Sequence, residues 1–309
     1  MDVKIGIIGC GAVGSLFAAH LAALDDVEVW IFDVWREHVE AIKRDGLRLT
    51  GIGELHTRPR ATTDATELPA LDFGIVATKG LYTRDAIAAS AHAFADAAVC
   101  SVQNGVGNEE VIAEYVPRVI RGTTFPAGRV TAPGVVQWDA AGKTWIGPFE
   151  PKPAPMEDVI RLAETLTRSG METQALADAR GAQWTKLIFN AASNALCSLT
   201  RLPHGRAALH PDVRWVMDAV ITEGKAVADA LGITMEKDPA DLLEESIAVA
   251  LDHKPSMLQD VFSRRRTEID QLNGGICRCG DEVGITTPFN RTAWYLIRGL
   301  EASWELEET

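Results

Sequence analysis

The chain has 309 residues, a length that favours two domains. Hydrophobic residues make up 47% of it and charged residues 24%, as in ordinary soluble globular proteins. The formal net charge of −13 argues against nucleic acid or an anionic membrane as the main partner, because both require a basic surface. A small anionic ligand stays compatible with this charge, since a cationic cleft can lie on an acidic protein.

The cysteines and the first residues indicate the compartment. The five cysteines are an odd number in mostly apolar or helical contexts, which favours a reducing cytoplasm over a disulfide framework. Cys277 and Cys279 are not accompanied by a second pair of Cys or His, so we expect no structural metal. The apolar run from Val3 to Gly9 is too short for a signal peptide or a membrane span.

A dinucleotide-binding fingerprint follows the first predicted strand. Residues 3–8 are typical of a buried parallel strand, and a helical pattern covers 15–24. Between them lies a G-x-G-x-x-G motif, whose glycines allow a tight turn, close approach of a pyrophosphate and packing of helix on strand. We expect the motif to bind a nicotinamide dinucleotide through Gly9, Cys10, Gly11, Ala12, Val13 and Gly14.

The second predicted strand, 27–32, ends at Asp33. This aspartate lies 19 positions after Gly14, close to the spacing of the acid that binds the cofactor ribose. An aspartate there favours NAD, because it bonds the 2′-hydroxyl and repels a 2′-phosphate. A turn or helix-capping aspartate fits the position as well, and Arg36, Lys43 and Arg44 nearby leave NADP open.

Two further strands, predicted at 72–77 and 97–102, are followed by polar residues. Lys79 comes after the first and Asn104 after the second. Ligands of doubly wound sheets bind at the carboxyl ends of strands, so we expect both side chains where cofactor and substrate meet. The alternatives are a solvated loop lysine and a turn asparagine before glycine.

The remaining pattern predicts an α/β first half and a helical second half. Residues 123–147 alternate as in two or three antiparallel strands that extend the sheet, before a helix at 156–169 and a last strand near 170–175. Only helical patterns follow. We therefore predict a Rossmann-type dinucleotide-binding domain at 1–175 and an all-helical domain at 176–309.

The predicted helix 182–199 is mostly apolar but carries a polar stripe. Lys186, Asn190 and Asn194 are spaced four residues apart, so they share one face with a drift of about 40° per step. A helix this apolar is expected to be buried nearly all round, and an unpaired buried ammonium is costly. The stripe therefore needs polar partners, and a polar cleft or a buried structural network could supply them.

A second polar segment follows a helix start at Pro255. Ser256 and Gln259 have the form of a capping box, which explains Ser256 at least as well as ligand binding does. The helix is predicted to continue through a charge-rich stretch to Gly274. Such stretches are usually solvated faces, but Glu268 is a carboxylate that could pair with Lys186.

These motifs resemble those of the ketopantoate reductases (2-dehydropantoate 2-reductases), nearly end to end. The motifs at 184–194 and 256–274 are much more specific than the glycine fingerprint. The matching segments are Gly9–Gly14, Ala77-Thr-Lys79, Gln103-Asn-Gly-Val-Gly107, Trp184–Asn194, Ser256-Met-Leu-Gln-Asp260 and Arg265–Gly274. The resemblance implies NAD(P)H-dependent reduction of ketopantoate to pantoate in pantothenate biosynthesis. It also implies a homodimer whose C-terminal domain is of the 6-phosphogluconate dehydrogenase C-terminal-like type, used for substrate binding and dimerisation.

The resemblance also implies roles for individual residues. In such enzymes the position of Lys186 is the proton donor, and the position of Glu268 helps to orient substrate and lysine. The position of Lys79 lies with that of Asn104 at the junction of cofactor and substrate. The substrate-binding positions are Asn190, Asn194, Ser256 and Asn104. Asp33 departs from the family, because many members have a basic residue in that region and prefer NADPH.

Three alternatives remain at this stage. A related NAD-dependent 2-hydroxyacid dehydrogenase would take another branched or hydroxylated 2-oxo acid. The β-hydroxyacid dehydrogenases also pair a lysine and an asparagine on a helix, but they lack the motif from Ser256 to Asn273. A non-catalytic NAD(P)H sensor would keep the glycines, with no reason to keep Lys186 and Glu268 together.

Overall fold

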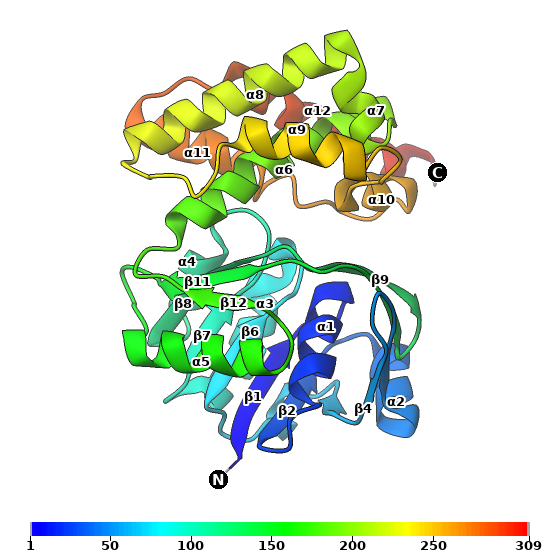
Figure 1. Ribbon diagram of the computed structural model, residues 1–309, viewed down its shortest axis with the longest axis vertical. Coiled ribbons are helices and arrows are strands. Elements are labelled where there is room, and N and C mark those ends of the chain that lie inside the picture. The colour runs from blue at the N-terminus through cyan, green and yellow to red at the C-terminus, as the bar shows by residue number, and fades with distance from the viewer. Residues whose placement is uncertain (1, 308–309) are drawn as a thin grey trace. The chain divides into compact units, whose positions relative to one another are not determined.

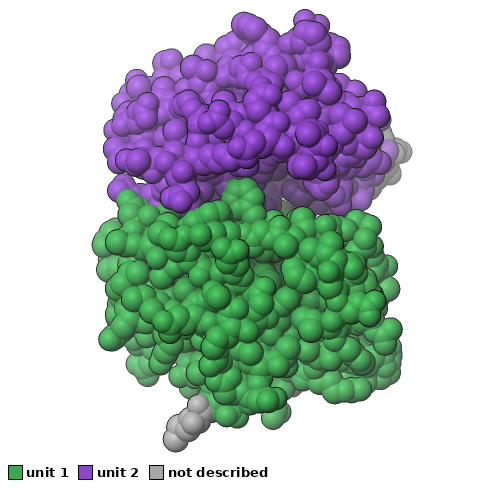
Figure 2. Space-filling model, viewed as in Figure 1, with its two compact units in different colours: residues 1–103, 108–179 green, residues 104–107, 180–309 purple. Residues whose placement is uncertain are grey.

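The computed structural model describes residues 2–307, which form two compact units. Unit 1 comprises Met1–Gln103 and Asn108–Ala179, and unit 2 comprises Asn104–Gly107 and Arg180–Thr309 (Figure 2). The short loop 104–107 therefore belongs to unit 2, although the residues on either side of it in the sequence belong to unit 1. In the described part of the chain, no helix has the length and apolarity that a bilayer crossing requires.

Unit 1 is built on an eight-stranded sheet. Its strands are β1 Val3–Ile8, β2 Val27–Phe32, β5 Arg60–Thr62, β6 Phe73–Val76, β7 Ala98–Ser101, β8 Arg118–Thr124, β11 Thr144–Pro148 and β12 Thr173–Ala175. Their spatial order is β12-β11-β8-β7-β6-β1-β2-β5. From β8 to β5 all neighbours are parallel, and β11 is antiparallel to β8. The chain adds strands on one side of β1 and then on the other, so a topological switch point lies between β1 and β6.

Side chains of successive strand residues pack on opposite faces of this sheet, as strand geometry requires. Ile7 lies in the core on one face, and Ile8 lies in the core on the other. Both are fully buried, like most of the β1 run. The buried parallel strand predicted at 3–8 is thereby confirmed.

Five helices and a second sheet complete unit 1 (Figure 1). The helices are α1 Ala12–Leu21, α2 Arg36–Asp45, α3 Thr83–Ser90, α4 Asn108–Ala113 and α5 Met156–Arg168, with 3-10 turns η1 Ala65–Glu67, η2 Gly80–Tyr82 and η3 Ala91–Phe94. The second sheet, in the order β4-β3-β10-β9, contains β3 Leu47–Gly51, β4 Leu55–Thr57, β9 Ala127–Ala132 and β10 Val135–Ala140. α1 contacts β1 on one side and β9 and β10 on the other, so it is buried between the two sheets.

Unit 2 is helical throughout its described regular structure. Its helices are α6 Arg180–Thr200, α7 His204–Leu209, α8 Pro211–Ala230, α9 Pro239–Val249, α10 Ser256–Phe262, α11 Asn273–Val283 and α12 Pro288–Glu307. α6 contacts each of the other six and buries most of its residues, as predicted for an apolar central helix.

Two predictions of secondary structure were wrong in part. Residues 123–147 were predicted to extend the main sheet, but the hairpin of β9 and β10 joins the second sheet, and only β11 and the end of β8 in this stretch belong to the main one. The helix predicted from Ser256 to Gly274 ends at Phe262, and α11 starts at Asn273. Arg264 has a φ of +50°, which an α-helix cannot accommodate. The irregular segment 263–272 carries Glu268.

Candidate active site

The glycine-rich turn connects β1 to α1. Gly9 has a φ of +90°, and a Cβ atom there would lie 2.7 Å from the backbone nitrogen of Thr78. A Cβ atom on Gly14 would lie 2.0 Å from the Gly9 carbonyl oxygen. Both positions therefore require glycine. Gly11, just before α1, has open space at its Cβ position, so its backbone is accessible to a phosphate at the helix N-terminus.

Asp33 joins this turn to the end of β2. Its Oδ2 atom accepts a hydrogen bond from the Cys10 backbone N–H at 2.5 Å, and its Oδ1 atom accepts one from the Trp35 N–H at 2.8 Å. The Asp33 carboxylate thus stabilises the turn, as in the alternative interpretation of Asp33 as a turn aspartate. The Cys10 thiol is buried beside Ser15, and burial raises its pKa to about 12. Cys10 therefore supplies no thiolate near neutral pH, and its backbone N–H is engaged by Asp33.

Lys79 and Asn104 follow neighbouring strands. Lys79 lies three residues beyond the end of β6, and Asn104 lies three residues beyond the end of β7. β6 and β7 pair in parallel, so the segments that follow them leave the sheet on the same side, at the carboxyl ends of the strands. Lys79 is half-buried and is the N-cap residue of the 3-10 turn η2.

The central feature of unit 2 is a hydrogen-bonded row of three side chains. The Lys186 ammonium donates from Nζ to Asn104 Oδ1 at 2.8 Å. Asn104 Nδ2 donates to Glu268 Oε2 at 3.0 Å. An ammonium can only donate and a carboxylate can only accept, so these partners fix the orientation of the amide. Asn104 therefore links the predicted proton donor to the predicted orienting carboxylate.

Burial changes the acidity of Lys186. It lowers the pKa of this ammonium to about 8, and the negative charge of Glu268 opposes the shift. With a pKa this close to neutral pH, Lys186 can both hold a proton and release it. The buried helix around it supplies the low-polarity surroundings that cause the shift.

Three backbone contacts position Asn104. Gly105 has a φ of +85°, and a Cβ atom there would lie 2.3 Å from the Gln271 carbonyl oxygen. The Val106 N–H donates to that same oxygen at 3.1 Å, and Gln183 Nε2 donates to the Gly105 oxygen at 3.2 Å. The Asn-Gly pair does form a turn, but the turn is fixed against α6 and the segment that carries Glu268. Neither Gln183 nor Gln271 was predicted as a site residue: Gln183 lies just before the motif at 184–194, and Gln271 acts here through its backbone carbonyl, which a sequence motif does not specify.

The segment around Glu268 is held by α12. The Glu301 carboxylate accepts hydrogen bonds from both the N–H and the hydroxyl of Thr267, at 2.8 and 2.6 Å. The indole N–H of Trp294 donates to Asp270 at 2.6 Å. Glu268 thus lies between two residues anchored to one helix, which restricts an otherwise irregular segment. Glu301 and Trp294 lie outside every motif of the sequence analysis.

The other predicted substrate residues lie on α6 and α10. Asn190 is half-buried and Asn194 is buried, both on the α6 face of Lys186. Ser256 is exposed as the first residue of α10, and the predicted capping box is not formed: Pro255 caps the helix, and Gln259 donates to the Lys254 carbonyl. Within the described residues, none of these three side chains hydrogen-bonds with the row of Lys186, Asn104 and Glu268.

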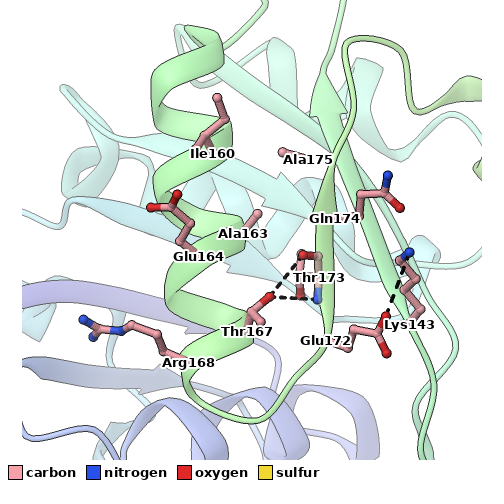
Figure 3. Close-up of a pocket in the computed structure, with 10 residues that line it drawn as sticks. All are labelled: Lys143, Ile160, Ala163, Glu164, Thr167, Arg168, Glu172, Thr173, Gln174 and Ala175. Carbon is pink, nitrogen blue, oxygen red and sulfur yellow. Dashed lines mark hydrogen bonds and ion pairs between the residues drawn. The ribbon is translucent and has the colours of Figure 1, made fainter.

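A groove of about 640 Å³ lies on the surface of unit 1, between α5 and β12 (Figure 3). Thr167 of α5 hydrogen-bonds with the backbone of Thr173, and Lys143 lies 3.9 Å from Glu172. None of the predicted site residues lines this groove. The groove is therefore separate from the residues described above.

Comparison with known families identifies the chain. Residues 5–151 match the family model described as ketopantoate reductase PanE/ApbA, and residues 178–301 match the model of its C-terminal part. The chain belongs to the ketopantoate reductase family. Among curated relatives, the 2-dehydropantoate 2-reductase of Pyrococcus horikoshii is 34% identical over 300 residues, covering 97% of this chain and 98% of the relative. That of Archaeoglobus fulgidus is 32% identical with the same coverages.

Solved structures of similar proteins agree with this family. A PanE/ApbA family ketopantoate reductase from Ralstonia eutropha is 32% identical with a TM-score of 0.89, covering 98% of this chain and all of that one. A D-mandelate dehydrogenase solved with NADH and anilino(oxo)acetate is 25% identical with a TM-score of 0.88, covering 97% and 99%. The Rossmann-type first half and the 6-phosphogluconate dehydrogenase C-terminal-like second half are thereby confirmed.

Proposed function

We propose that the chain reduces ketopantoate to pantoate with a nicotinamide cofactor, as an oxidoreductase acting on the CH–OH group. The observation that carries this proposal is the row of Lys186, Asn104 and Glu268, which presents an ammonium of lowered pKa beside a polar bridge. The membership of the ketopantoate reductase family supports the choice of substrate. The bound nicotinamide supplies a hydride to the carbonyl carbon.

The residues of the chain manage the charge that develops on the carbonyl oxygen. Lys186 stabilises this charge and delivers its proton to the oxygen. Asn104 holds the ammonium and Glu268 in fixed positions, and Glu268 orients the substrate and lysine. Asn190, Asn194 and Ser256 are proposed to hydrogen-bond the substrate without adding charge.

Unit 1 is proposed to hold the cofactor. The turn from Gly9 to Gly14 and the N-terminus of α1 fit a pyrophosphate, because backbone N–H groups and the helix dipole favour anions there. Asp33 is proposed to contact the ribose of the cofactor, and Lys79 is proposed to contact its nicotinamide end. We assign cofactor binding to residues 1–175, and substrate binding and dimerisation to residues 176–309.

The test is steady-state reduction of a panel of 2-oxo acids with NADH and with NADPH. Ketopantoate is expected to give the highest kcat/KM. The second candidate is a dehydrogenase of another 2-oxo acid, supported by the likeness to D-mandelate dehydrogenase with its aromatic oxo ligand. This second candidate would be favoured if phenylglyoxylate gave a higher kcat/KM than ketopantoate. Cofactor binding without turnover of any panel member would leave the NAD(P)H sensor instead.

Asp33 is expected to make NADH the preferred cofactor. A 2′-phosphate would meet its carboxylate, and a repulsion of about 1.4 kcal/mol already changes affinity tenfold. Lys43 and Arg44 are each close to a carboxylate of α2, Glu40 and Asp45, which reduces their attraction for a phosphate. Asp33→Asn should raise the kcat/KM ratio of NADPH to NADH at least about tenfold.

The matched control for this charge change is Glu37→Gln, which removes an exposed carboxylate from the first turn of α2. It is expected to leave the ratio within about twofold, as for a solvent-screened charge. A wild-type enzyme that strongly prefers NADPH would refute the role given to Asp33.

The rate of reduction is expected to fall with rising pH. The ammonium form of Lys186 is fully populated well below its pKa of about 8 and is lost above it. kcat for reduction should therefore be constant near pH 6 and fall about tenfold per unit beyond pH 8. Oxidation of the hydroxy acid should show the opposite trend, because it requires the neutral amine.

Glu268→Gln provides the internal comparison for this pH profile. The carboxylate of Glu268 raises the pKa of Lys186, so its removal should move the falling limb to lower pH. A profile that stays flat from pH 6 to 10, or a limb that Glu268→Gln leaves in place, would contradict the assignment.

We also propose a homodimer formed through unit 2 and working in a reducing cytoplasm, without nucleic acid. Apolar side chains on α8 and α12 support the dimer, since Trp215, Tyr295 and Leu296 are all more than half exposed. All five cysteines are free thiols, and the acidic net charge disfavours nucleic acid. Light scattering that gives a monomer at assay concentrations would refute the dimer.

A further inference from the structure

Gln103 is a buried amide that the proposed reaction has not used. Only 5% of its surface is exposed. Its Nε2 group donates to the Thr78 carbonyl at 2.9 Å, to the Thr78 hydroxyl at 3.1 Å and to the Thr83 hydroxyl at 2.7 Å. Its Oε1 atom accepts from the Ser101 hydroxyl at 3.2 Å. The Thr78 carbonyl can only accept, so the NH₂ end of the amide must point toward it.

These bonds connect the ends of two neighbouring strands. Gln103 follows β7, and Thr78 follows β6. Thr78 is the residue before Lys79, and Gln103 is the residue before Asn104. One buried amide thus fixes the two backbone positions from which the proposed cofactor and substrate residues start.

The connection continues along the same edge of the sheet. Thr78 packs against Gly9, where even a Cβ atom would approach its backbone nitrogen to 2.7 Å. The next residue, Cys10, donates its N–H to Asp33 at the end of β2. The carboxyl ends of β7, β6, β1 and β2 are therefore linked in their spatial order. Gln103 provides the only side-chain bonds to Thr78 among the hydrogen bonds of the described residues.

We propose that Gln103 is a positioning residue, whose amide sets the backbone of Lys79 after β6 and of Asn104 after β7. A buried amide with a purely structural role would affect only the stability of unit 1. A positioning role has consequences at both sites, because Thr78 also packs on the cofactor turn and Asn104 carries the bonds to Lys186 and Glu268. Displacement of a reacting group by about 1 Å can lower a rate on the order of 10²-fold.

The test compares variants at a temperature where circular dichroism shows each to be folded. Gln103→Met keeps the length of the side chain but removes its donors. It is expected to lower kcat for 2-oxo acid reduction about 10- to 100-fold and to weaken NADH binding on the order of tenfold. Ser101→Ala is the matched control, since it removes two buried hydrogen bonds between the Ser101 hydroxyl and Gln103 and leaves the bonds to Thr78. It should change both quantities less than about twofold.

Gln103→Asn is the second variant, for the case that Gln103→Met does not fold. Its amide is one methylene too short to reach Thr78, and it should lower kcat about tenfold. Folded variants with wild-type kcat and wild-type NADH affinity would overturn the proposal, even if their melting temperature fell. The kinetic arm rests on the proposed function. If the wild-type chain binds NADH but reduces no 2-oxo acid, that function fails, and the NADH dissociation constants of the variants alone decide the role of Gln103.

Discussion

Lys186→Ala is expected to lower kcat for 2-oxo acid reduction at least about 100-fold, because a positioned general acid contributes about 10²–10⁴ to a rate. The variant removes both the proton and the charge that stabilises the developing oxyanion. Its affinity for the cofactor should stay near that of the wild type, since the proposed cofactor residues other than Asn104 lie in unit 1. Stopped-flow reduction and fluorescence titration with NADH measure the two quantities separately.

Lys186→Arg separates the two contributions of the lysine. Arginine keeps the positive charge but holds its proton at any accessible pH. The variant should bind the substrate and still react slowly, with no fall of rate near pH 8. Lys237→Ala is the control, because Lys237 is a partly exposed lysine of the same unit that pairs with Glu245. If Lys186→Ala kept near-normal turnover, Lys186 would not be the proton donor.

Asn104→Leu is expected to lower kcat by about 10²-fold, the second largest effect. The substitution keeps the approximate shape of the side chain and removes its bonds to Lys186 and Glu268. Hydrogen bonds to charged groups contribute about 1.5–3 kcal/mol each, and 1.4 kcal/mol corresponds to a tenfold change. The ammonium and the carboxylate would both lose the partner that orients them.

Asn104→Asp tests the same bridge from the opposite direction. A carboxylate at this position would raise the pKa of Lys186 and repel Glu268. The fall of the reduction rate should therefore move to higher pH than in the wild type. A wild-type pH profile in Asn104→Asp, together with a wild-type kcat in Asn104→Leu, would show that the bridge has no part in the reaction.

Features that depend on local sequence were predictable. The strand, turn and helix around Gly9 follow from residues close together in the chain, and the structure has all three. The spacing of Lys186, Asn190 and Asn194 likewise determines which face of α6 they share, whatever surrounds the helix. The structure answers the question of partners for Lys186, which the helix alone left open.

Features that depend on distant residues were not predictable from one sequence. Asn104 bridges Lys186 and Glu268 across 82 and 164 positions of the chain. The clamp of Thr267 by Glu301 spans 34 positions and involves a residue with no motif. The end of the helix at Phe262 escaped prediction for a local reason: Arg264 takes the left-handed position of a Schellman motif, in which the Arg265 N–H donates to the Asp260 carbonyl, and glycine usually occupies that position.

Hydride transfer from NADH to ketopantoate can be followed directly with a deuterium label. Wild-type enzyme is mixed with ketopantoate and NADH that carries deuterium at both C4 positions, and the product is analysed by mass spectrometry. We expect pantoate with one deuterium at C2, formed at least about 100-fold more slowly by Lys186→Ala. Oxidation of NADH without deuterated pantoate, or equal rates in the two proteins, would contradict this expectation.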